Sequence, residues 1–580
     1  QNKIGIRAFI KNKKNNSGTV SFEYKDLDQL NNPNAVTAVN ADLDLYWNAI
    51  QTSFAGWWAG NQWPMLQVTR IECMTWGSTY ENAYTPGSFN GSWNGAYAGL
   101  VPDIDAMNLM AAEKESWIHV GAGKILKGYI LQMLVDKHGD IPYTEAWQGT
   151  ENAQPNFDSQ TAVYDVAGGL YDEAIADLNK TAIGAPGVDI YYGSSAAKWI
   201  KLANTLKFRM ALNKGDAGGI SAALAAGVID ATADDWRFQY GSNRSNPNSR
   251  HPWYSGAYES GASSYTSNYF MWELHEEKMM ADPRVRYYYK RQDLDASNED
   301  LFTLDCVVTG TEPQWYKDPY VNAYGATTSW PFCLGSNMVE AGAENAKGYW
   351  GRDHGNDDGT PPDGQKRTAR GIYPAAGMYD DGNAASGIFG SGFGHTQRSG
   401  TTGGGGDGHQ PMLMSSMIYF MRAEAAQDGL SSENARDMLE MAVNRSIDEV
   451  MSYSAGWGEV GDFNADGVGL LPSANSGRQI TNYVNYVLNA YDAASDSEAK
   501  LNIIVKEFRL ACMGNGIEPF NSMRRTGHPT EMQSSMKAAS AGTFPRLFPY
   551  PSDVTNLNAN APVRTGLGEK VFWDRAGSLN

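Results

Sequence analysis

Residues 117–146 read WIHVGAGKILKGYILQMLVDKHGDIPYTEA, and the pattern of this stretch recurs in much of the chain. Its apolar residues recur at intervals of one, three and four, which places them on one face of a helix. The helix ends near His138, because Gly139-Asp140 and Pro142 favour a turn. A helix with one apolar face needs a neighbour to cover it. That face consists of Ala122, Ile125, Leu126, Tyr129, Ile130, Met133 and Leu134.

The same apolar spacing continues on both sides of this first stretch. A further helix follows Pro155, another surrounds Trp199, and residues 97–113 supply one before them. Residues 97–215 are therefore predicted to form four successive helices. The two later apolar faces consist of Val163, Val166, Ala167, Leu170, Tyr171, Ala174 and Leu178, and of Trp199, Leu202, Ala203, Leu206 and Met210.

Residues 411–515 repeat this pattern and are predicted to form a second set of four helices. Ser495 and Glu498 have the spacing of a capping box before the last helix. Helix pairs in succession favour tetratricopeptide-like stacking, in which each pair buries its apolar face on the next. We therefore expect a mainly α fold with four tetratricopeptide-like helix pairs. The apolar positions of the second set include Met414, Met417, Ile418, Met421, Ala435, Met438, Leu439, Ala442, Leu501, Ile504, Val505 and Phe508, together with the stretch 483–491.

No Pro/Ser-rich or charged linker divides the chain, so residues 1–580 are expected to form a single domain. The helical scaffold covers 97–215 and 411–515, and residues 516–580 are expected to be irregular. Residues 216–410 lack helical periodicity and are rich in Gly, Ser, Asn, Asp and aromatic residues, which indicates an insertion of long loops. Such insertions often carry function.

Charge and composition exclude several classes of protein. The net charge of −19 disfavours nucleic acid, since its binders gain affinity from clustered Lys and Arg. The chain has no run of about 18 apolar residues that could span a membrane. The chain opens at Gln1 without a charged and apolar leader, so a secretory signal was removed or never existed. The four cysteines lack zinc-site spacing, although Cys306 and Cys333 could pair in an oxidising compartment.

Several short motifs, in a fixed order along the chain, carry a resemblance to a known family. They are HGDIPYTEA at 138–146, AAKWIKLANTLKFRMAL at 196–212, GRDHG at 351–355 with GIYP at 371–374, NGIEPF at 515–520 with RRTGHP at 524–529, and FPRL at 544–547 with YP at 550–551. In this order, and with matching helices, they resemble a divergent branch of the SusD/RagB family. The resemblance runs from about residue 28 to 575.

The resemblance implies a nutrient-binding lipoprotein on the extracellular face of the outer membrane. It also implies a SusC-like TonB-dependent transporter as partner and an oligosaccharide as cargo. The chain lacks the N-terminal lipidated cysteine of such lipoproteins, so membrane attachment is expected only through an anchor missing from this sequence. The motif residues Gly139, Pro142, Arg524, Arg525 and Tyr550-Pro551 are expected to be turn and packing determinants rather than ligand contacts.

No catalytic signature such as HExxH or GxSxG is present in the sequence, so we expect a protein that is not an enzyme. No cofactor is required on this interpretation. One structural calcium site is conceivable, because Asp462, Asn464 and Asp466 precede Gly467 in the order of an EF-hand loop. Its twelfth position is Ser473 instead of Glu, and a simple polar turn is the alternative.

Aromatic residues make up 12% of the chain, and those in loops are candidate glycan contacts, since sugars present flat C–H faces to rings. Trp117 and Trp199 lie on apolar helical faces, and Trp93 with Tyr97 begins a helix, so all four are expected in the core. The candidate rings lie ahead of the first helix and in the insertion. They are Trp76, Tyr80 and Tyr84, and Trp253, Tyr254, Trp315, Tyr316, Tyr320 and Trp330.

Two alternative functions remain open at this stage. A peptide-capturing relative would bind through backbone hydrogen bonds and charge, and a peptide library would detect it. A glycoside hydrolase would need a pair of carboxylates whose separation a sequence does not reveal.

Replacing Trp76 or Trp315 by Ala is predicted to weaken glycan binding without changing the melting temperature, because loop rings contribute little to the core. Calorimetric titration and thermal unfolding measure the two effects separately. Unchanged affinity in both variants would reject these rings as the binding site.

Overall fold

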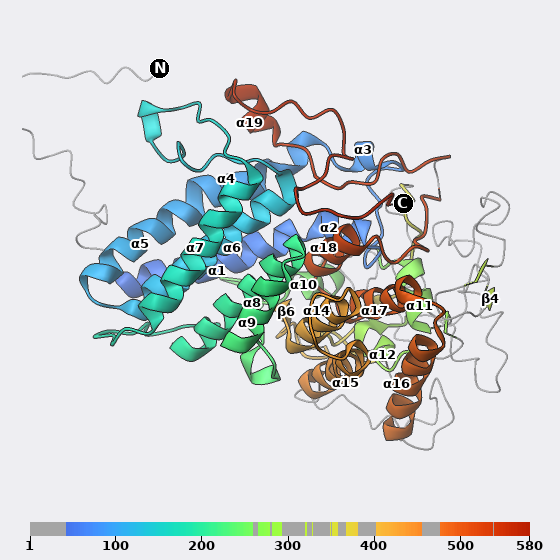
Figure 1. The fold of residues 1–580 in the computed structure, drawn as a ribbon. Helices are drawn as coiled ribbons and strands as arrows, with labels where there is room; N and C mark the ends of the chain where they lie inside the picture. Colours follow the sequence, from blue (N-terminus) through green and yellow to red (C-terminus); the bar gives the residue numbers. More distant parts are fainter. Residues whose placement is uncertain are drawn as a thin grey trace, which may run out of the picture. The chain divides into compact units, whose positions relative to one another are not determined.

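The computed structural model describes residues 42–258, 265–275, 277–278, 281–292, 320–321, 327–328, 349, 351–357, 367–380, 402–454, 476–536 and 539–579. Leu43–Asn580 form one compact unit. The described residues are mainly helical with a few short strands, which confirms the predicted fold class (Figure 1). No helix in the described ranges is long and apolar enough to cross a membrane.

The first helical set lies where the sequence predicts it. Its helices are α5 (Val101–Glu113), α6 (Trp117–His138), α7 (Gln160–Leu178) and α8 (Ala196–Lys214), and each packs on the next. Gly121 and Gly128 bring α6 close to α7. A Cβ at Gly128 would lie 2.6 Å from the Tyr171 ring, and one at Gly121 would lie 2.4 Å from Leu178. Close backbone approach therefore explains the glycines of the opening stretch.

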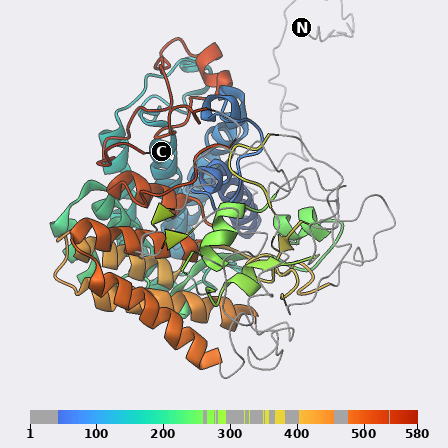
Figure 2. The same ribbon diagram turned by 90° about the vertical axis from the view of Figure 1, so that its right-hand side faces the viewer.

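The second set is also present. It consists of α14 (Ser415–Gln427), α15 (Ala435–Ser454), α16 (Ser476–Ala493) and α17 (Ser497–Ala511), which pack in succession as tetratricopeptide-like pairs would (Figure 2). The cap of α17 differs from the predicted one. Asp496, and not Ser495, accepts the hydrogen bond from the Ala499 backbone N–H at 2.8 Å. A carboxylate at this position also interacts favourably with the helix dipole.

Helices before Trp93 were not predicted. The structure has α1 (Leu43–Asn61) and α2 (Trp63–Val68), and α1 buries Trp47, Phe54 and Trp58. Shorter elements follow before α5 and within later loops. They are α3 (Tyr80–Ala83), the 3-10 turn η2 (Pro86–Phe89), α4 (Asn90–Asn94), the π-helical turn η3 (Gly95–Leu100), and the 3-10 turns η4 (Gly149–Glu151) and η5 (Thr232–Asp234).

The described part of the insertion contains short helices and two-residue to five-residue strands. The helices are α9 (Ala217–Ala226), α10 (Pro252–Tyr258), α11 (Asn268–His275) and α12 (Val285–Tyr288). Three antiparallel pairs of strands join β1 (Trp236–Gln239) to β6 (His409–Leu413), β2 (Tyr289–Lys290) to β5 (Ala369–Arg370), and β3 (Tyr320–Val321) to β4 (Thr327–Thr328). The first of these pairs matters most here, because Phe238 lies opposite Gln410 beside a cleft described below.

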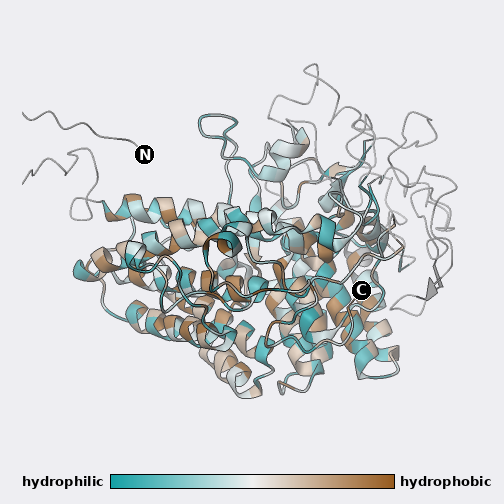
Figure 3. Ribbon diagram, turned by 90° about the horizontal axis from the view of Figure 1, so that it is seen from above, coloured by the Kyte–Doolittle hydropathy of each residue, from teal (hydrophilic) through white to brown (hydrophobic). Residues whose placement is uncertain are grey.

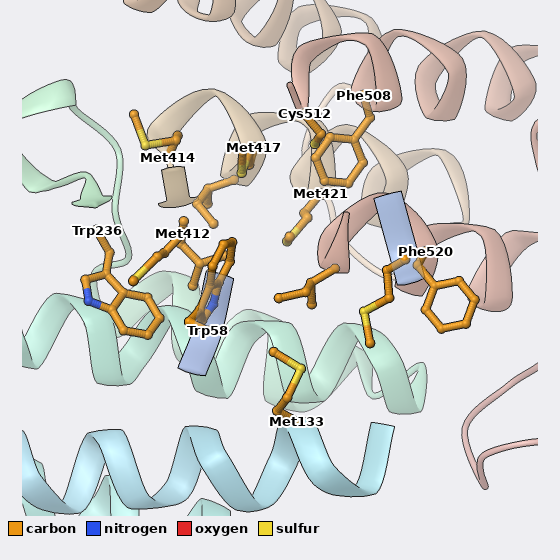
Figure 4. Packing of buried hydrophobic residues seen from close by; sticks show 14 of the residues in the cluster. Trp58, Met133, Trp236, Met412, Met414, Met417, Met421, Phe508, Cys512 and Phe520 are labelled. Carbon is orange, nitrogen blue, oxygen red and sulfur yellow. The ribbon is translucent and has the colours of Figure 1, made fainter. Parts of the chain in front are cut away.

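One apolar core joins the two helical sets (Figure 4). Trp58 from α1, Met133 from α6 and Trp236 from β1 meet Met417 from α14 and Phe520 from α18 (Ile517–Thr526), and all five are buried. Hydrophobic and hydrophilic residues alternate along the helices, as their periodicity predicts (Figure 3). Burying each large apolar side chain contributes about 1.5–3 kcal/mol, so this core stabilises both sets together.

The sequence suggested that the C-terminal region is irregular, but part of it is helical. It forms α18 (Ile517–Thr526) and α19 (Ser552–Leu557). Arg525 is buried and bonds both oxygens of Glu424 in α14, at 2.6 and 2.9 Å. Arg524 donates to the Asp136 and Arg546 carbonyls at 2.5 and 2.7 Å. The expectation that both arginines are structural is confirmed.

Replacing Arg525 by Met is predicted to destabilise the protein by about 3–5 kcal/mol, because it leaves the buried Glu424 carboxylate without its cation. Arg436→Met is the matched control. Arg436 also binds a carboxylate, Asp492 at 2.9 Å, but its side chain is 37% exposed, so its loss should cost at most about 1 kcal/mol. Chemical denaturation measures both values, and equal losses would contradict the prediction.

Candidate functional site

A cleft of about 870 Å³ lies between α1 and the segment that runs from β1 into α10. This volume falls in the range of ligand-binding pockets, about 300–1,000 Å³. One wall is the exposed face of α1, and the other is built from β1, the loop after it and the start of α10. Trp63 of α2 and Gln410 of β6 complete the lining.

The second wall is a series of rings set edge to face. The Phe238 and Tyr240 ring centroids are 4.9 Å apart, Tyr240 and His251 are 4.7 Å apart, and His251 and Trp253 are 5.7 Å apart. Phe238, Tyr240 and Trp253 are only partly buried. These three rings can therefore offer apolar surface to a ligand while their neighbours hold them in place.

The wall formed by α1 is made of small residues. Thr52, Ala55, Gly56, Ala59 and Gly60 recur at intervals of three and four, so they share one face of the helix. No bulky side chain from these positions enters the cleft.

The loop after β1 is held by its own hydrogen bonds and by the glycine-rich segment before β6. Gly241 N–H donates to the Ser249 carbonyl at 2.9 Å, and His251 N–H donates to the Gly406 carbonyl at 2.9 Å. Gly406 has φ +84°, and a Cβ there would lie 2.8 Å from Tyr254. The glycine run 403–406 is therefore pinned beneath the start of α10, where it supports the ring wall.

The cleft is mainly apolar and nearly uncharged. Its lining includes four residues with carboxamides, each of which also hydrogen-bonds within the protein, namely Gln62, Gln239, Asn248 and Gln410. Of the described residues that line it, only Arg250 carries a formal charge, and its buried side chain donates to the Asn248 side-chain oxygen at 3.1 Å. Such a surface suits a neutral ligand that needs hydrogen bonds and ring contacts.

His251 stays neutral at physiological pH. Burial, together with the nearby Arg370 guanidinium, lowers the pKa of His251 to about 3. Its Nδ1 accepts a hydrogen bond from the Trp253 backbone N–H at 3.1 Å, which requires the unprotonated nitrogen. The imidazole thus links Tyr240 to Trp253 as a neutral ring.

The three predicted rings before α5 differ in their exposure to solvent. Trp76 is 70% exposed, as expected of a loop ring. The expectation that Tyr80 and Tyr84 are exposed is wrong. Tyr80 lies in α3, accepts a hydrogen bond from Arg70 at 2.8 Å and stacks on Tyr84, and both rings are buried in the core. Buried rings offer no face to a ligand from solvent.

In the insertion, Trp253 lines the cleft, but Tyr254 does not offer an exposed ring. Tyr254 is buried, stacks on Tyr258 at 4.6 Å and donates to the Thr402 carbonyl at 3.0 Å. Tyr320 begins β3. The predicted Trp315, Tyr316 and Trp330, the calcium candidates Asp462, Asn464 and Asp466, and the pair Cys306 and Cys333 all lie outside the described residues.

Sequence reasoning missed Phe238, Tyr240 and the α1 wall. The alternation of Phe238 and Tyr240 across Gln239 is the pattern of side chains on one face of a strand, and it could have marked them. Within the described ranges, no group of three or more His, Cys, Asp or Glu residues could hold a metal ion.

Two family models match the sequence. One, described as "Starch-binding associating with outer membrane" and labelled SusD-like, matches residues 34–319. The other, described as "Susd and RagB outer membrane lipoprotein", matches residues 406–565. A comparison with curated protein sequences gives no match.

Solved structures are similar to this fold over nearly its whole length. A chitin-binding protein has 17% identity and a TM-score of 0.62, with 92% of this chain and all of that chain covered. A SusD homologue from Bacteroides fragilis has 16% identity and a TM-score of 0.61, covering 93% and 100%. A chitin-binding SusD homologue from Flavobacterium johnsoniae has 17% identity and a TM-score of 0.58, covering 92% and 99%.

The depressed pKa of His251 predicts a specific acid sensitivity. The folded protein resists protonation of this ring, whereas the unfolded chain accepts a proton near pH 6.5. The free energy of unfolding is therefore not reduced by this group above pH 6.5, and it decreases as the pH falls below that value. Between pH 7 and pH 5, protonation of His251 in the unfolded chain should lower the free energy of unfolding by about 2 kcal/mol. His251→Asn keeps an acceptor for the Trp253 N–H and should remove that part of the loss. Denaturation at both pH values tests this, and an identical loss in both proteins would refute it.

Proposed function

We propose that this chain, which belongs to the SusD/RagB family, captures glycans at the cell surface without catalysis and delivers them to a TonB-dependent transporter of the SusC type. The family consists of outer-membrane lipoproteins by its own description, which supports attachment to the extracellular face through a lipid anchor. The transporter as partner rests on the same membership. The cleft beside α1 is the proposed binding site.

The single observation that carries this proposal is the pairing of partly exposed rings with carboxamides in a nearly uncharged cleft. Phe238, Tyr240 and Trp253 supply flat apolar surface for the C–H faces of sugar rings. Side-chain amides such as those of Asn248 and Gln239 supply donors and acceptors for hydroxyl groups. A neutral glycan needs both kinds of contact and no ion pair.

The cleft also favours a neutral glycan over the two alternative ligands. A charged peptide or an acidic glycan would require an accessible counter-charge, yet Arg250 is the only charged residue of the described lining and its side chain is buried. A glycoside hydrolase would require two carboxyl groups about 5–9.5 Å apart. The described lining contributes no carboxylate, so hydrolysis in this cleft has no support.

Replacing Trp253 by Ala is predicted to weaken glycan binding about tenfold or more, because the variant loses a ring face and its buried contact area. The test is calorimetric titration with chitohexaose, cellohexaose and maltohexaose, since two similar structures are named for chitin binding. Trp147→Ala is the control, because that ring is also partly exposed but packs on Tyr97 away from the cleft lining.

Wild-type affinity should be nearly independent of salt, because no exposed ion pair forms with a neutral sugar. No new reducing ends should appear on incubation with the same hexasaccharides. Binding of peptides but of none of the glycans, or equal losses in the two tryptophan variants, would contradict this function and this site.

A further inference from the structure

The packing of the described residues does not explain the bare face of α1. A Cβ built at Gly56 or at Gly60 meets no atom of these residues within 4 Å. Neither residue has a positive φ, so the backbone does not require glycine either. This differs from Gly121 and Gly128, where a neighbouring helix occupies the space of the missing side chain.

Glycine within a helix is also unfavourable in itself, since it loses more conformational freedom on folding than any other residue. Gly56 is the fourteenth residue of the 19-residue α1, and Gly60, one turn further along the same face, is its second-last residue, so this cost falls mainly on Gly56. Both line the cleft opposite the wall that carries Tyr240 and Trp253. The space left by the two missing side chains is therefore part of the cleft.

We infer that Gly56 and Gly60 are specificity-determining residues, which keep α1 bare so that a glycan chain lies between the helix backbone and the ring wall. This inference rests on the proposed function. One face of the glycan would stack on Phe238, Tyr240 and Trp253, and its other face would lie on α1. Helix carbonyls left uncovered at a glycine keep a second lone pair, which a sugar hydroxyl can use as an acceptor.

The rise of an α-helix separates Gly56 from Gly60 by about 6 Å along the axis. A side chain at either position would project into the same cleft at a different point along it. The two positions therefore test separate parts of a bound chain. Ala55 and Ala59, which flank them, already carry the smallest side chain that a chiral residue has.

The test uses the full chain with Gly56→Leu and Gly60→Leu, and with Gly169→Leu as the matched control. Gly169 lies in the middle of α7, is exposed, and also has no atom within 4 Å of a built Cβ, but it does not line the cleft. Affinity is measured by calorimetry for chitohexaose, cellohexaose and maltohexaose. Melting temperatures are measured in parallel.

We expect both cleft variants to lose about tenfold or more in affinity, and the control to stay within about twofold of the wild type. All three melting temperatures should be unchanged or higher, because Leu is the better helix former. If a leucine variant fails to fold, Gly56→Ala and Gly60→Ala decide the question. Each should bind about threefold more weakly, since a methyl group takes part of the space.

Unchanged affinity in the glycine variants, with binding lost in Trp253→Ala, would overturn this inference and leave the proposed function intact. In that case the glycan lies on the rings but not on α1. If the wild-type protein binds none of the three hexasaccharides, the proposed function fails, and the role assigned to the two glycines fails with it.

Discussion

The arrangement of the described chain depends on one buried carboxylate, Asp136, in the last turn of α6. Its oxygens accept hydrogen bonds from Tyr164 of α7, Arg209 of α8, Asn521 of α18 and Trp573 near the C-terminus. Arg209 also bonds both oxygens of Glu518 at 2.9 Å. Because an uncompensated charge in the interior costs several kcal/mol, these groups must all be in place together. One carboxylate thereby fixes the first helical set to the C-terminal region.

The turn between α17 and α18 connects the contacts around Asp136 to the cleft. Gly516 N–H donates to the Gln62 side chain at 3.1 Å, and the Gln410 side chain donates to the Gly514 carbonyl at 2.6 Å. Both glutamines line the cleft. A Cβ at Gly516 would lie 2.3 Å from the Leu66 nitrogen, so α2 rests directly on this turn. The position of the cleft amides thus follows from how the C-terminal region packs on the helices.

Helical periodicity predicted the parts of the fold that are held by regular apolar faces. The helices around Tyr129 and Phe508 lie where their stripes indicate, because burial of such a stripe is local information. Tyr80 and Tyr84 were misjudged, since a polar, glycine-rich surrounding does not reveal that Arg70 and Gln67 will meet their hydroxyl groups in the core. Partners far apart in the sequence decide burial, and composition does not record them. The cleft was missed for the same reason, because α1 and β1 meet only in the folded chain.

Charge is distributed unequally between the scaffold and the cleft, and this difference has a physical consequence. Buried ion pairs such as Arg525 with Glu424 are fully desolvated and hold the elements in one geometry. A neutral cleft loses less on dehydration, but its contacts are correspondingly weak, and each ring contributes only about 0.5–1.5 kcal/mol beyond its buried area. Under the proposed function, binding strength would therefore come from several sugar units held along this cleft, with little reorganisation on binding. Such weak, repeated contacts on a rigid scaffold would also allow rapid release of the ligand, which the proposed delivery to a transporter requires.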